Sequence, residues 1–312
     1  MSILNYNPLR KLRAFTLAMF ALLAGTVILA GCSSDDTPFS QEPGNIVEVA
    51  QADGNFTTLL SAAADANLAG TLQSDGPFTV FAPTDDAFQN LPDGLLESLS
   101  QQQLAEILSY HVVQAEVPSS SLQAEQAVET VAGGDIFVTV ANGSVTVNDN
   151  ANVIAADIEA SNGIIHAIDQ VLLPDAYLDV VGIVTKRYNL QTLEDAVVSA
   201  GLASTLGQDT EDGYTVFAPA NAAFEGLDLS GLTTEQLQGV LTYHVLPATV
   251  LSGDLSASQT VTTVNGETLL IEVSGGAVTL TDQQGNTYQV TEANIEGSNG
   301  VVHIIDGVLM PG

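Results

Sequence analysis

The hydrophobic pattern predicts an amphipathic helix near the start of each half of the chain. Apolar side chains at the i, i+3, i+4 and i+7 positions share one face of a helix, and this spacing is met by Phe56, Leu59, Leu60 and Ala63. Asn55 precedes them as the predicted N-cap. The second half repeats the arrangement with Leu190, Leu193 and Val197. There Asn189 is the predicted N-cap, and Gly201 marks the expected end of the helix.

Short apolar runs that end at a proline predict a buried strand in each half. The first run covers Phe78–Ala82 and the second covers Tyr214–Ala218. Pro83 and Pro219 follow them, and we assign these prolines a structural role because proline cannot donate to a strand ladder. After the first strand, helical segments are expected over residues 84–88 and 101–108.

The later part of each half is predicted to be β-structure. Asn142-Gly143 and Gly275-Gly276 each lie between two strand-like runs, which predicts a hairpin. A longer turn is expected over Asp282–Asn286, and a last strand over Ile164–Ile168 that continues to Leu173. Helices followed by strands predict an α+β fold with a largely antiparallel sheet.

Three motifs occur twice in the same order, and they contain all four histidines. Thr79–Pro83 returns as Thr215–Pro219, Tyr110-His111 as Tyr243-His244, and Ser161–Asp169 as Ser298–Asp306. The repeat is about 130 residues long, which is the size of a whole domain. We therefore expect domains at residues 42–174 and 175–311. The junction near residues 174–177 is short, so the two domains are expected to touch.

The N-terminus has the parts of an export signal. Three basic residues precede an apolar run over Ala14–Ala30, which predicts a signal peptide at residues 1–31. The run ends in Leu29–Cys32, which resembles the lipobox of bacterial lipoproteins, whose cysteine is acylated. An ordinary signal peptide with an incidental thiol is the alternative. Residues 32–41 are predicted to form a tether, and Ser33 resembles the sorting pattern for the outer membrane, with the domains periplasmic or surface-exposed.

The charge balance limits the partners that the protein can bind. The chain has 37 acidic residues, all after the signal, and only Lys186 and Arg187 are basic in that part. Nucleic acids and anionic lipids are bound through basic side chains, so both are excluded as partners. Repulsion between carboxylates is weakest at high salt, which favours a saline habitat, although an ordinary acidic exported protein is the alternative.

The repeated motifs resemble those of fasciclin domains. Thr79–Phe88 is similar to the first signature block of that family, Ser161–Asp169 to the second, and Tyr110-His111 to the dipeptide between them. Asn45–Ala50 resembles the usual domain start. The resemblance covers nearly all of residues 42–311, in both copies. It implies two tandem fasciclin-like domains, each a wedge of mainly antiparallel strands with several packed helices, and an extracellular adhesion or matrix-interaction role.

The resemblance also suggests a surface for partner binding. In animal members of the family, the Tyr-His dipeptide and an Asp-Ile dipeptide have been implicated in integrin contact. The matching residues here are Tyr110, His111, Asp157, Ile158, Tyr243 and His244. The second copy departs from the pattern, with Asn294-Ile295 in place of Asp-Ile. We do not carry over integrin binding, but we expect these segments to lie near a possible partner-binding surface.

The histidines and carboxylates are interpreted as structural. His111 and His244 adjoin apolar residues, as do His166 and His303, and buried neutral rings with satisfied nitrogens are the common use of histidine in a core. Asp85 follows a strand-ending Pro-Thr, which is typical of a helix cap. A calcium-loop spacing at Asn148, Asn150, Asn152 and Glu159 is treated as a coincidence, because Val153 stands where the loop needs glycine. We predict no metal and no cofactor.

No catalytic motif appears in the sequence, so we expect no enzymatic activity. The leading hypothesis is a lipid-anchored adhesion module of the cell envelope that binds an extracellular protein or a matrix polysaccharide. The membrane is then reached through the N-terminal lipid. The alternative is a small-ligand or cation-binding envelope protein.

Overall fold

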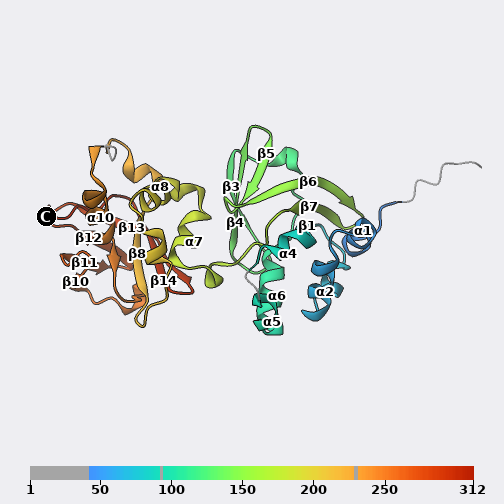
Figure 1. The fold of residues 1–312 in the computed structure, drawn as a ribbon, viewed down its shortest axis with the longest axis horizontal. Helices are drawn as coiled ribbons and strands as arrows, with labels where there is room; N and C mark the ends of the chain where they lie inside the picture. Colours follow the sequence, from blue (N-terminus) through green and yellow to red (C-terminus); the bar gives the residue numbers. More distant parts are fainter. Residues whose placement is uncertain (1–41, 92–93, 228–230) are drawn as a thin grey trace, which may run out of the picture. The chain divides into compact units, whose positions relative to one another are not determined.

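The computed structural model describes residues 42–91, 94–227 and 231–312 (Figure 1). The expected signal peptide, Cys32 and the tether lie outside this part of the chain. Within it, no helix is long and apolar enough to cross a membrane. Two sheets of seven strands are formed, one from each half, and we refer to the parts of the chain that form them as domain 1 and domain 2.

Domain 1 begins with helices and continues with strands, as the sequence predicts. The helices are α1 (Ile46–Asp53), α2 (Thr57–Asp65), α3 (Ala69–Leu72), α4 (Asp85–Gln89), α5 (Leu95–Ser98) and α6 (Gln101–Tyr110). The strands are β1 (Phe78–Pro83), β2 (Val112–Val113), β3 (Glu125–Glu129), β4 (Asp135–Ala141), β5 (Ser144–Val147), β6 (Ala151–Ala160) and β7 (Gly163–Ile168). A short 3-10 helix, η1 (Ser119–Ser121), follows β2.

Domain 2 repeats this order. Its helices are α7 (Val180–Thr185), α8 (Gln191–Ser199), α9 (Ala203–Leu206) and α10 (Thr234–Tyr243), with 3-10 helices η2 (Asp175–Tyr177), η3 (Tyr188–Leu190), η4 (Asn221–Phe224) and η6 (Ser252–Asp254). Its strands are β8 (Tyr214–Pro219), β9 (Val245–Leu246), β10 (Ser258–Thr262), β11 (Thr268–Ser274), β12 (Ala277–Thr281), β13 (Thr287–Gly297) and β14 (Gly300–Ile305).

The sheet of domain 1 has the order β2-β1-β7-β6-β5-β4-β3. All neighbours are antiparallel except β1 and β7, which run parallel with Phe81 opposite His166. In domain 2 the matching order is β9-β8-β14-β13-β12-β11-β10, with β8 and β14 parallel. The predicted α+β class and the mainly antiparallel strands are therefore confirmed in both domains.

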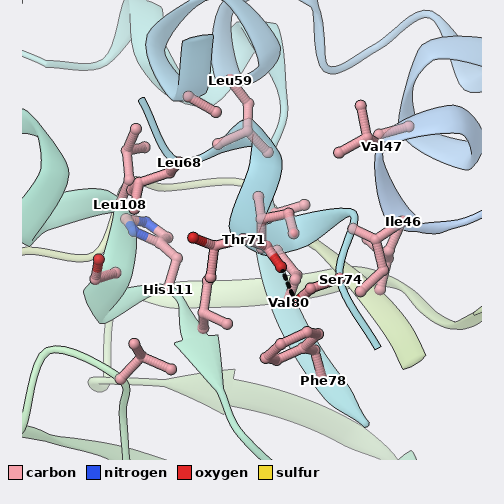
Figure 2. A pocket seen from close by; sticks show the side chains of 18 of the residues that line it. Ile46, Val47, Leu59, Leu68, Thr71, Ser74, Phe78, Val80, Leu108 and His111 are labelled. Atoms are coloured by element: carbon pink, nitrogen blue, oxygen red, sulfur yellow. Dashed lines mark hydrogen bonds between the residues drawn. The ribbon is translucent and has the colours of Figure 1, made fainter. Parts of the chain in front are cut away.

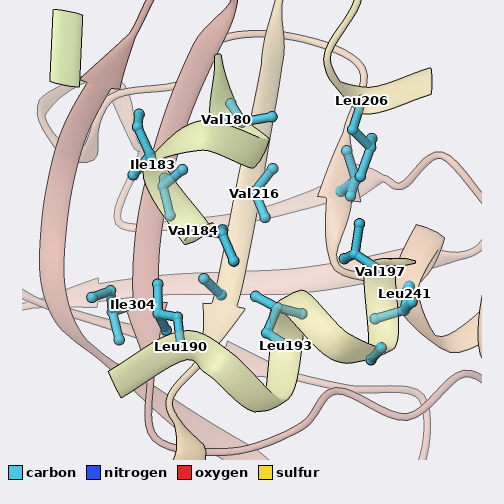
Figure 3. Close-up of a cluster of buried hydrophobic side chains, with 14 of the residues drawn as sticks. Val180, Ile183, Val184, Leu190, Leu193, Val197, Leu206, Val216, Leu241 and Ile304 are labelled. Carbon is cyan, nitrogen blue, oxygen red and sulfur yellow. The ribbon is translucent and has the colours of Figure 1, made fainter. Parts of the chain in front are cut away.

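Each sheet has a hydrophobic cluster on both faces. One cluster of domain 1 lies between the helices and β1 and β7, and includes Phe56, Leu59 and Val80. The other joins Phe81 and Ile168 to Ile136 and Val138, which come from distant positions in the strand order. The sheet must therefore fold over on itself to bury them. Figure 3 shows the helix-side cluster of domain 2, where side chains from α7 and α8 pack on β8.

The predicted hairpin turns are confirmed. Ala141 pairs with Ser144 across Asn142-Gly143, and both turn residues have positive φ (52° and 81°), as a two-residue type I′ turn requires. Gly275 and Gly276 do the same in domain 2, with φ of 61° and 87°. The turn over residues 282–286 is also present. The first-half strand at Ile164 ends at Ile168 and does not continue to Leu173.

The predicted helix caps need a correction. Helix α2 begins at Thr57 after Phe56, and helix α8 begins at Gln191 after Leu190, so neither Asn55 nor Asn189 is the N-cap. The residues before these helices provide no side-chain cap. The caps come from a distant part of the chain, which local sequence reasoning does not see.

Asp85 caps helix α2. Its carboxylate accepts hydrogen bonds from the amide of Thr58 (2.7 Å) and from the hydroxyl and amide of Thr57 (2.7 and 3.3 Å). In domain 2, Asn221 accepts from the amide of Thr192 (3.0 Å) in the same way. Asp85 is therefore a helix cap, but of α2, which precedes the strand. Helix α4, which follows the strand, is capped by Thr84.

The two domains touch, and the contact uses both basic residues. Residues 42–312 form one compact unit. Lys186 lies 2.6 Å from Asp175 and donates to the Tyr110 hydroxyl of domain 1 (3.1 Å). Arg187 bonds Glu292 (3.0 Å) and stacks over the Phe137 ring of domain 1 at 4.7 Å. Both cations are buried, at 3% and 6% exposure.

Candidate functional site: the paired histidine networks

The three repeated motifs meet around β1 in domain 1 and β8 in domain 2, each the second strand from one edge of its sheet. Thr79–Pro83 forms β1, Tyr110-His111 ends α6 and leads into β2, and Ser161–Asp169 contains β7. Because β1 pairs with both β2 and β7, the motifs lie side by side. Their polar side chains form one hydrogen-bonded network in each domain, and this network is the candidate site.

His111 joins the end of helix α6 to the segment after β7. Its Nδ1 lies 2.8 Å from the carbonyl oxygen of Ile107, and its Nε2 accepts from the amide of Leu172 (2.9 Å). Because Nε2 accepts, the proton of the neutral ring must be on Nδ1, where it donates to Ile107. His244 does the same with Val240 (2.8 Å) and Leu309 (2.9 Å).

Burial keeps these two rings neutral. His111 and His244 are 1% and 2% exposed, and burial lowers the pKa of each to about 4, although the carbonyl partner opposes the shift. Both nitrogens of each ring are occupied by backbone groups. Neither ring has a free nitrogen with which to accept a proton from a substrate or to bind a metal.

His166 and His303 adopt the opposite tautomer. The Nδ1 of His166 accepts from the amide of Asp157 (3.2 Å), so Nε2 carries the proton and donates to the carbonyl of Val117 (2.9 Å). In domain 2, His303 accepts from Asn294 (3.1 Å) and donates to Val250 (3.0 Å). Burial lowers the pKa of His303 below its ordinary value.

The threonine of the first motif holds the same segment. The hydroxyl of Thr79 donates to the carbonyl of Ala115 (2.7 Å) and accepts from the amide of Val117 (2.9 Å). Thr215 bonds Ala248 and Val250 in the same way. The segment after β2 is therefore fixed from β1 by threonine and from β7 by histidine.

The Asp-Ile dipeptide forms a bulge in β6. Asp157 has φ of 57°, in the left-handed region, and the register between β6 and β7 shifts beside it. Asn294 has φ of 62° in β13. Aspartate and asparagine tolerate this backbone conformation better than other residues with a side chain, which explains the departure from Asp-Ile in the second copy.

The side chain at the bulge also binds the segment after β2. The carboxylate of Asp157 accepts from the hydroxyl and the amide of Ser119, and these bonds hold its pKa below the ordinary value. Asn294 accepts from the amide of Ser252 (2.8 Å) and donates to its hydroxyl (2.8 Å). The amide replaces the carboxylate without loss of a contact.

The tyrosine of each Tyr-His dipeptide is buried as well. Tyr110 donates to the carbonyl of Asp135 (2.5 Å), and burial raises the pKa of its hydroxyl. Tyr243 donates to Thr268 (2.9 Å), and burial raises its pKa to about 12. Tyr110 differs from Tyr243 in accepting a bond from Lys186 at the contact between the domains.

The burial of these side chains limits which of the expected residues can form a partner-binding surface. Tyr110, His111, Tyr243 and His244 are at most 2% exposed, so their side chains do not contribute to the surface of the folded domains. Asp157 is exposed and Ile158 is half-buried. At these positions, a partner can reach only the bulge.

Asn162 is a central residue that the sequence reasoning missed. Its side chain accepts from the amide of Ile46 at the start of α1 (2.9 Å) and donates to the carbonyls of Leu72 and Ser74 after α3 (2.8 Å each). Asn299 makes the equivalent bonds to Val180, Leu206 and Gln208 in domain 2. The sequence signal that could have identified this asparagine is its presence in both copies of the Ser-Asn-Gly motif.

The glycine of that motif is required by close packing. A Cβ on Gly163 would lie 2.0 Å from the carbonyl oxygen of Phe78, and one on Gly300 would lie 2.2 Å from that of Tyr214. Pro83 and Pro219 are the last residues of β1 and β8, where the ladder ends as expected.

The calcium-like spacing does not form a loop of ligands. Asn148 is buried, and its side chain accepts from the amide of Phe137 (2.9 Å), while Asn152 donates to Asp169 (2.9 Å). Across the described residues, no group of three or more histidine, cysteine or carboxylate side chains is arranged to hold a metal ion.

Comparison with known proteins agrees with this geometry. The fasciclin domain family matches residues 54–174 and 188–311. Human periostin is 32% identical over 278 residues, which are 88% of this chain and 32% of periostin. Protein sll1483 of Synechocystis is 47% identical over 133 residues, 41% of this chain and 73% of that protein. The chain thus spans about a third of periostin.

A solved structure shares the fold. A FAS1 domain pair from the insect cell adhesion molecule fasciclin I is 20% identical, with a TM-score of 0.51 over 84% of this chain and 95% of that one. The family match covers most of both domains, including the repeated motifs at β2-β1-β7 and β9-β8-β14. The chain therefore belongs to the fasciclin domain family, with two such domains in tandem.

Proposed function

We propose that this protein is a lipid-anchored adhesion module of the bacterial cell envelope. It binds an extracellular protein or a matrix polysaccharide and catalyses no reaction. The outer membrane is the proposed location, reached through an acylated Cys32.

The observation that supports a binding role is the use of the motif side chains within each domain. All four histidines direct both ring nitrogens to backbone partners, and the Asp157 carboxylate is engaged by Ser119. Groups used in this way support a rigid scaffold and are not available for acid–base chemistry. Membership of the fasciclin family, with a relative from a cell adhesion molecule, supports adhesion.

The contact between the domains supports attachment at two points. Lys186 and Arg187 join Asp175 to Tyr110 and Phe137, so the two domains hold their binding surfaces at a defined spacing. Linked sites bind with an avidity above that of either site when a partner can engage both. A polymeric matrix offers such repeated sites.

The charge of the module narrows the class of partner. Residues 32–312 carry 37 acidic and two basic residues, and the two basic ones are buried. A polyanionic partner would be repelled, so we propose a neutral polysaccharide or a protein with a basic surface.

The proposal is tested by attachment of the source bacterium under flow. A strain that lacks the protein is expected to detach from a surface coated with its own matrix, and the wild-type chain should restore attachment. The Cys32→Ser chain, which cannot be acylated, should be exported without restoring it, whereas the matched Ser34→Ala chain should restore it fully. Equal attachment with and without the protein would refute the adhesion role. Attachment restored by Cys32→Ser would refute the lipid anchor alone.

A second candidate, binding of a small ligand, is favoured by one observation. Domain 1 contains an apolar cavity of about 240 Å³, whereas the equivalent cavity of domain 2 measures about 30 Å³.

A further inference from the structure

The cavity of domain 1 lies between its helices and strand β1 (Figure 2). Ile46 and Val47 of α1, Leu59 of α2, and Phe78 and Val80 of β1 line it. An engineered apolar cavity of about 150 Å³ stays dry and binds benzene, so a cavity of about 240 Å³ is large enough for a somewhat larger apolar molecule. Its walls are mainly hydrophobic, and the side chains of the described residues leave this volume unfilled.

The second domain shows how the same fold fills this space. Ile46 and Val180 occupy equivalent positions, because each amide is held by the asparagine of the Ser-Asn-Gly motif. Counting along the helices from these anchors, Ala50 of α1 corresponds to Val184 of α7. Thr58 and Thr192 are equivalent through their caps, so Ala63 of α2 corresponds to Val197 of α8.

These two alanine-to-valine differences fall on the cavity wall. Ala50 and Ala63 line the cavity in domain 1, and Val184 and Val197 line its small counterpart. Figure 3 shows Val184 and Val197 with Leu193 in the filled cluster of domain 2. Each added pair of methyl groups occupies space that domain 1 leaves open. The fold does not require the cavity, since domain 2 is built without it.

The residues at the mouth of the cavity restrict the charge of the molecule that can bind there. Among the polar residues that line the cavity, Thr71, Ser74 and Gln114 are exposed, Ser109 is half-buried and His111 is buried, and the apolar Val131 is 46% exposed. Asp75 is the one charged residue among those that line the cavity, and it is also exposed. A carboxylate placed here would meet Asp75 without a cation to balance it, in a strongly acidic protein.

We propose that domain 1 binds a small uncharged apolar molecule in this cavity, with its hydrocarbon part among the side chains of α1, α2 and β1 and any hydroxyl group at the mouth beside Thr71 and Gln114. Domain 2 lacks this activity because Val184 and Val197 fill the equivalent space. This function is independent of adhesion and can hold whether or not the protein binds a matrix.

The proposal is tested with 1-octanol and octanoate as probes of equal chain length and different charge. The chain from residue 32 onward, carrying Cys32→Ser, is titrated at about pH 8, where octanoate is ionised. We expect octanol to raise the melting temperature in proportion to saturation, with one molecule bound per chain by calorimetry, and octanoate to bind at least about tenfold more weakly. No stabilisation by octanol, or equal binding of both probes, would overturn the proposal.

Two sets of variants locate the site. Ala50→Val with Ala63→Val should abolish octanol binding while the chain stays folded, because domain 2 carries both valines. Val184→Ala with Val197→Ala should add a second octanol site. Asp75→Lys replaces an exposed negative charge at the mouth by a positive one, so it should raise octanoate affinity. This variant tests the site even if the alanine variants unfold. Octanol binding that survives the two valines, or octanoate binding unchanged by Asp75→Lys, would contradict the assignment.

Discussion

His111 and His166 use opposite tautomers to connect backbone segments that no regular strand pairing joins. His111 binds α6 to the segment after β7, and His166 binds the β6 bulge to the segment after β2. His244 and His303 repeat the arrangement in domain 2. Imidazole suits these positions because one neutral ring can donate and accept in opposite directions.

Removal of the His111 ring should lower stability without changing any chemistry. His111→Ala leaves the Leu172 amide and the Ile107 carbonyl buried without partners, which typically costs about 1–3 kcal/mol for each unsatisfied group. We expect the melting temperature to fall by several degrees in calorimetry and the metal content to stay unchanged. Full stability combined with loss of a bound metal would identify the histidine as a ligand site instead.

The buried histidines also predict a pH dependence. The pKa of His111 and His244 falls from 6.5 to about 4 on folding, so the unfolded chain binds more protons between these values. Their stabilising contribution is therefore complete above about pH 6.5 and is lost as the pH falls toward 4. Between pH 7.5 and 5 the loss is about 2 kcal/mol for each ring.

The measurement is urea unfolding at both pH values, with His111→Gln as the comparison. Glutamine can donate and accept but does not titrate, and the other groups of the two chains titrate alike. The variant should lose about 2 kcal/mol less stability than the wild type when the pH is lowered. The same pH dependence in both chains would show that His111 is not the titrating group.

At the level of helices and strands, long-range caps position α2 and α8. Asp85 accepts three hydrogen bonds from Thr57 and Thr58 at the start of α2. Burial raises the pKa of Asp85, but these bonds outweigh the burial and hold the pKa below its ordinary value. Asn221 shows that an uncharged side chain serves the same purpose in domain 2.

This comparison predicts how substitutions at Asp85 behave. Asp85→Asn should retain most of the stability, whereas Asp85→Ala should cost about 1–2 kcal/mol through the lost cap. Asp86→Ala is the matched control, because that neighbouring side chain accepts a surface bond from Gln89 within its own helix and its loss should change stability little. Chemical denaturation provides the measurement. Equal costs for Asp85→Ala and Asp86→Ala would argue against the cap.

Much of each domain was predictable from local pattern. The strand that ends at Pro83, helix α6 and the Asn142-Gly143 hairpin follow from periodicity and turn chemistry. Strand β6 was not predicted, because its exposed residues and the bulge at Asp157 break the alternation of apolar and polar side chains.

The candidate site was harder to predict. The motif histidines were identified from the repeat. The hydrogen bonds of Asn162, the cap formed by Asp85 and the unfilled cavity were not predicted, because each depends on residues far apart in the chain. A difference as small as Ala63 against Val197 has no signal in periodicity, since both residues suit the apolar face of a helix.

At the scale of the whole molecule, a large negative charge opposes the stability of the folded state. The two basic residues of the described domains are buried at the contact between them, where Asp175 opposes the lowering of the Lys186 pKa by burial. Asp175 and Glu292 pair with these two cations, and the other carboxylates of the described domains have no lysine or arginine left to pair with. Their mutual repulsion destabilises the compact state.

Salt should therefore stabilise the protein. At about 1 M ionic strength the Debye length is about 3 Å, so repulsion between surface carboxylates becomes short-ranged. The buried ion pairs are screened less than the surface charges. We expect the melting temperature to rise steadily from low salt to about 1 M sodium chloride. Potassium chloride should act alike if the effect is screening. A flat or falling curve would contradict the repulsion argument.

The two domains are proposed to act together as one attachment module. The most direct test compares dissociation of the Cys32→Ser chain from immobilised matrix of the source organism with that of the same chain carrying Lys186→Ala and Arg187→Ala. Calorimetry verifies that both domains remain folded. We predict slow dissociation of the intact chain and faster dissociation of the variant, because its domains stay linked but lose the fixed spacing that lets both engage the matrix at once. Absence of binding, or equal dissociation rates for the two chains, would show that the domains do not attach at two points.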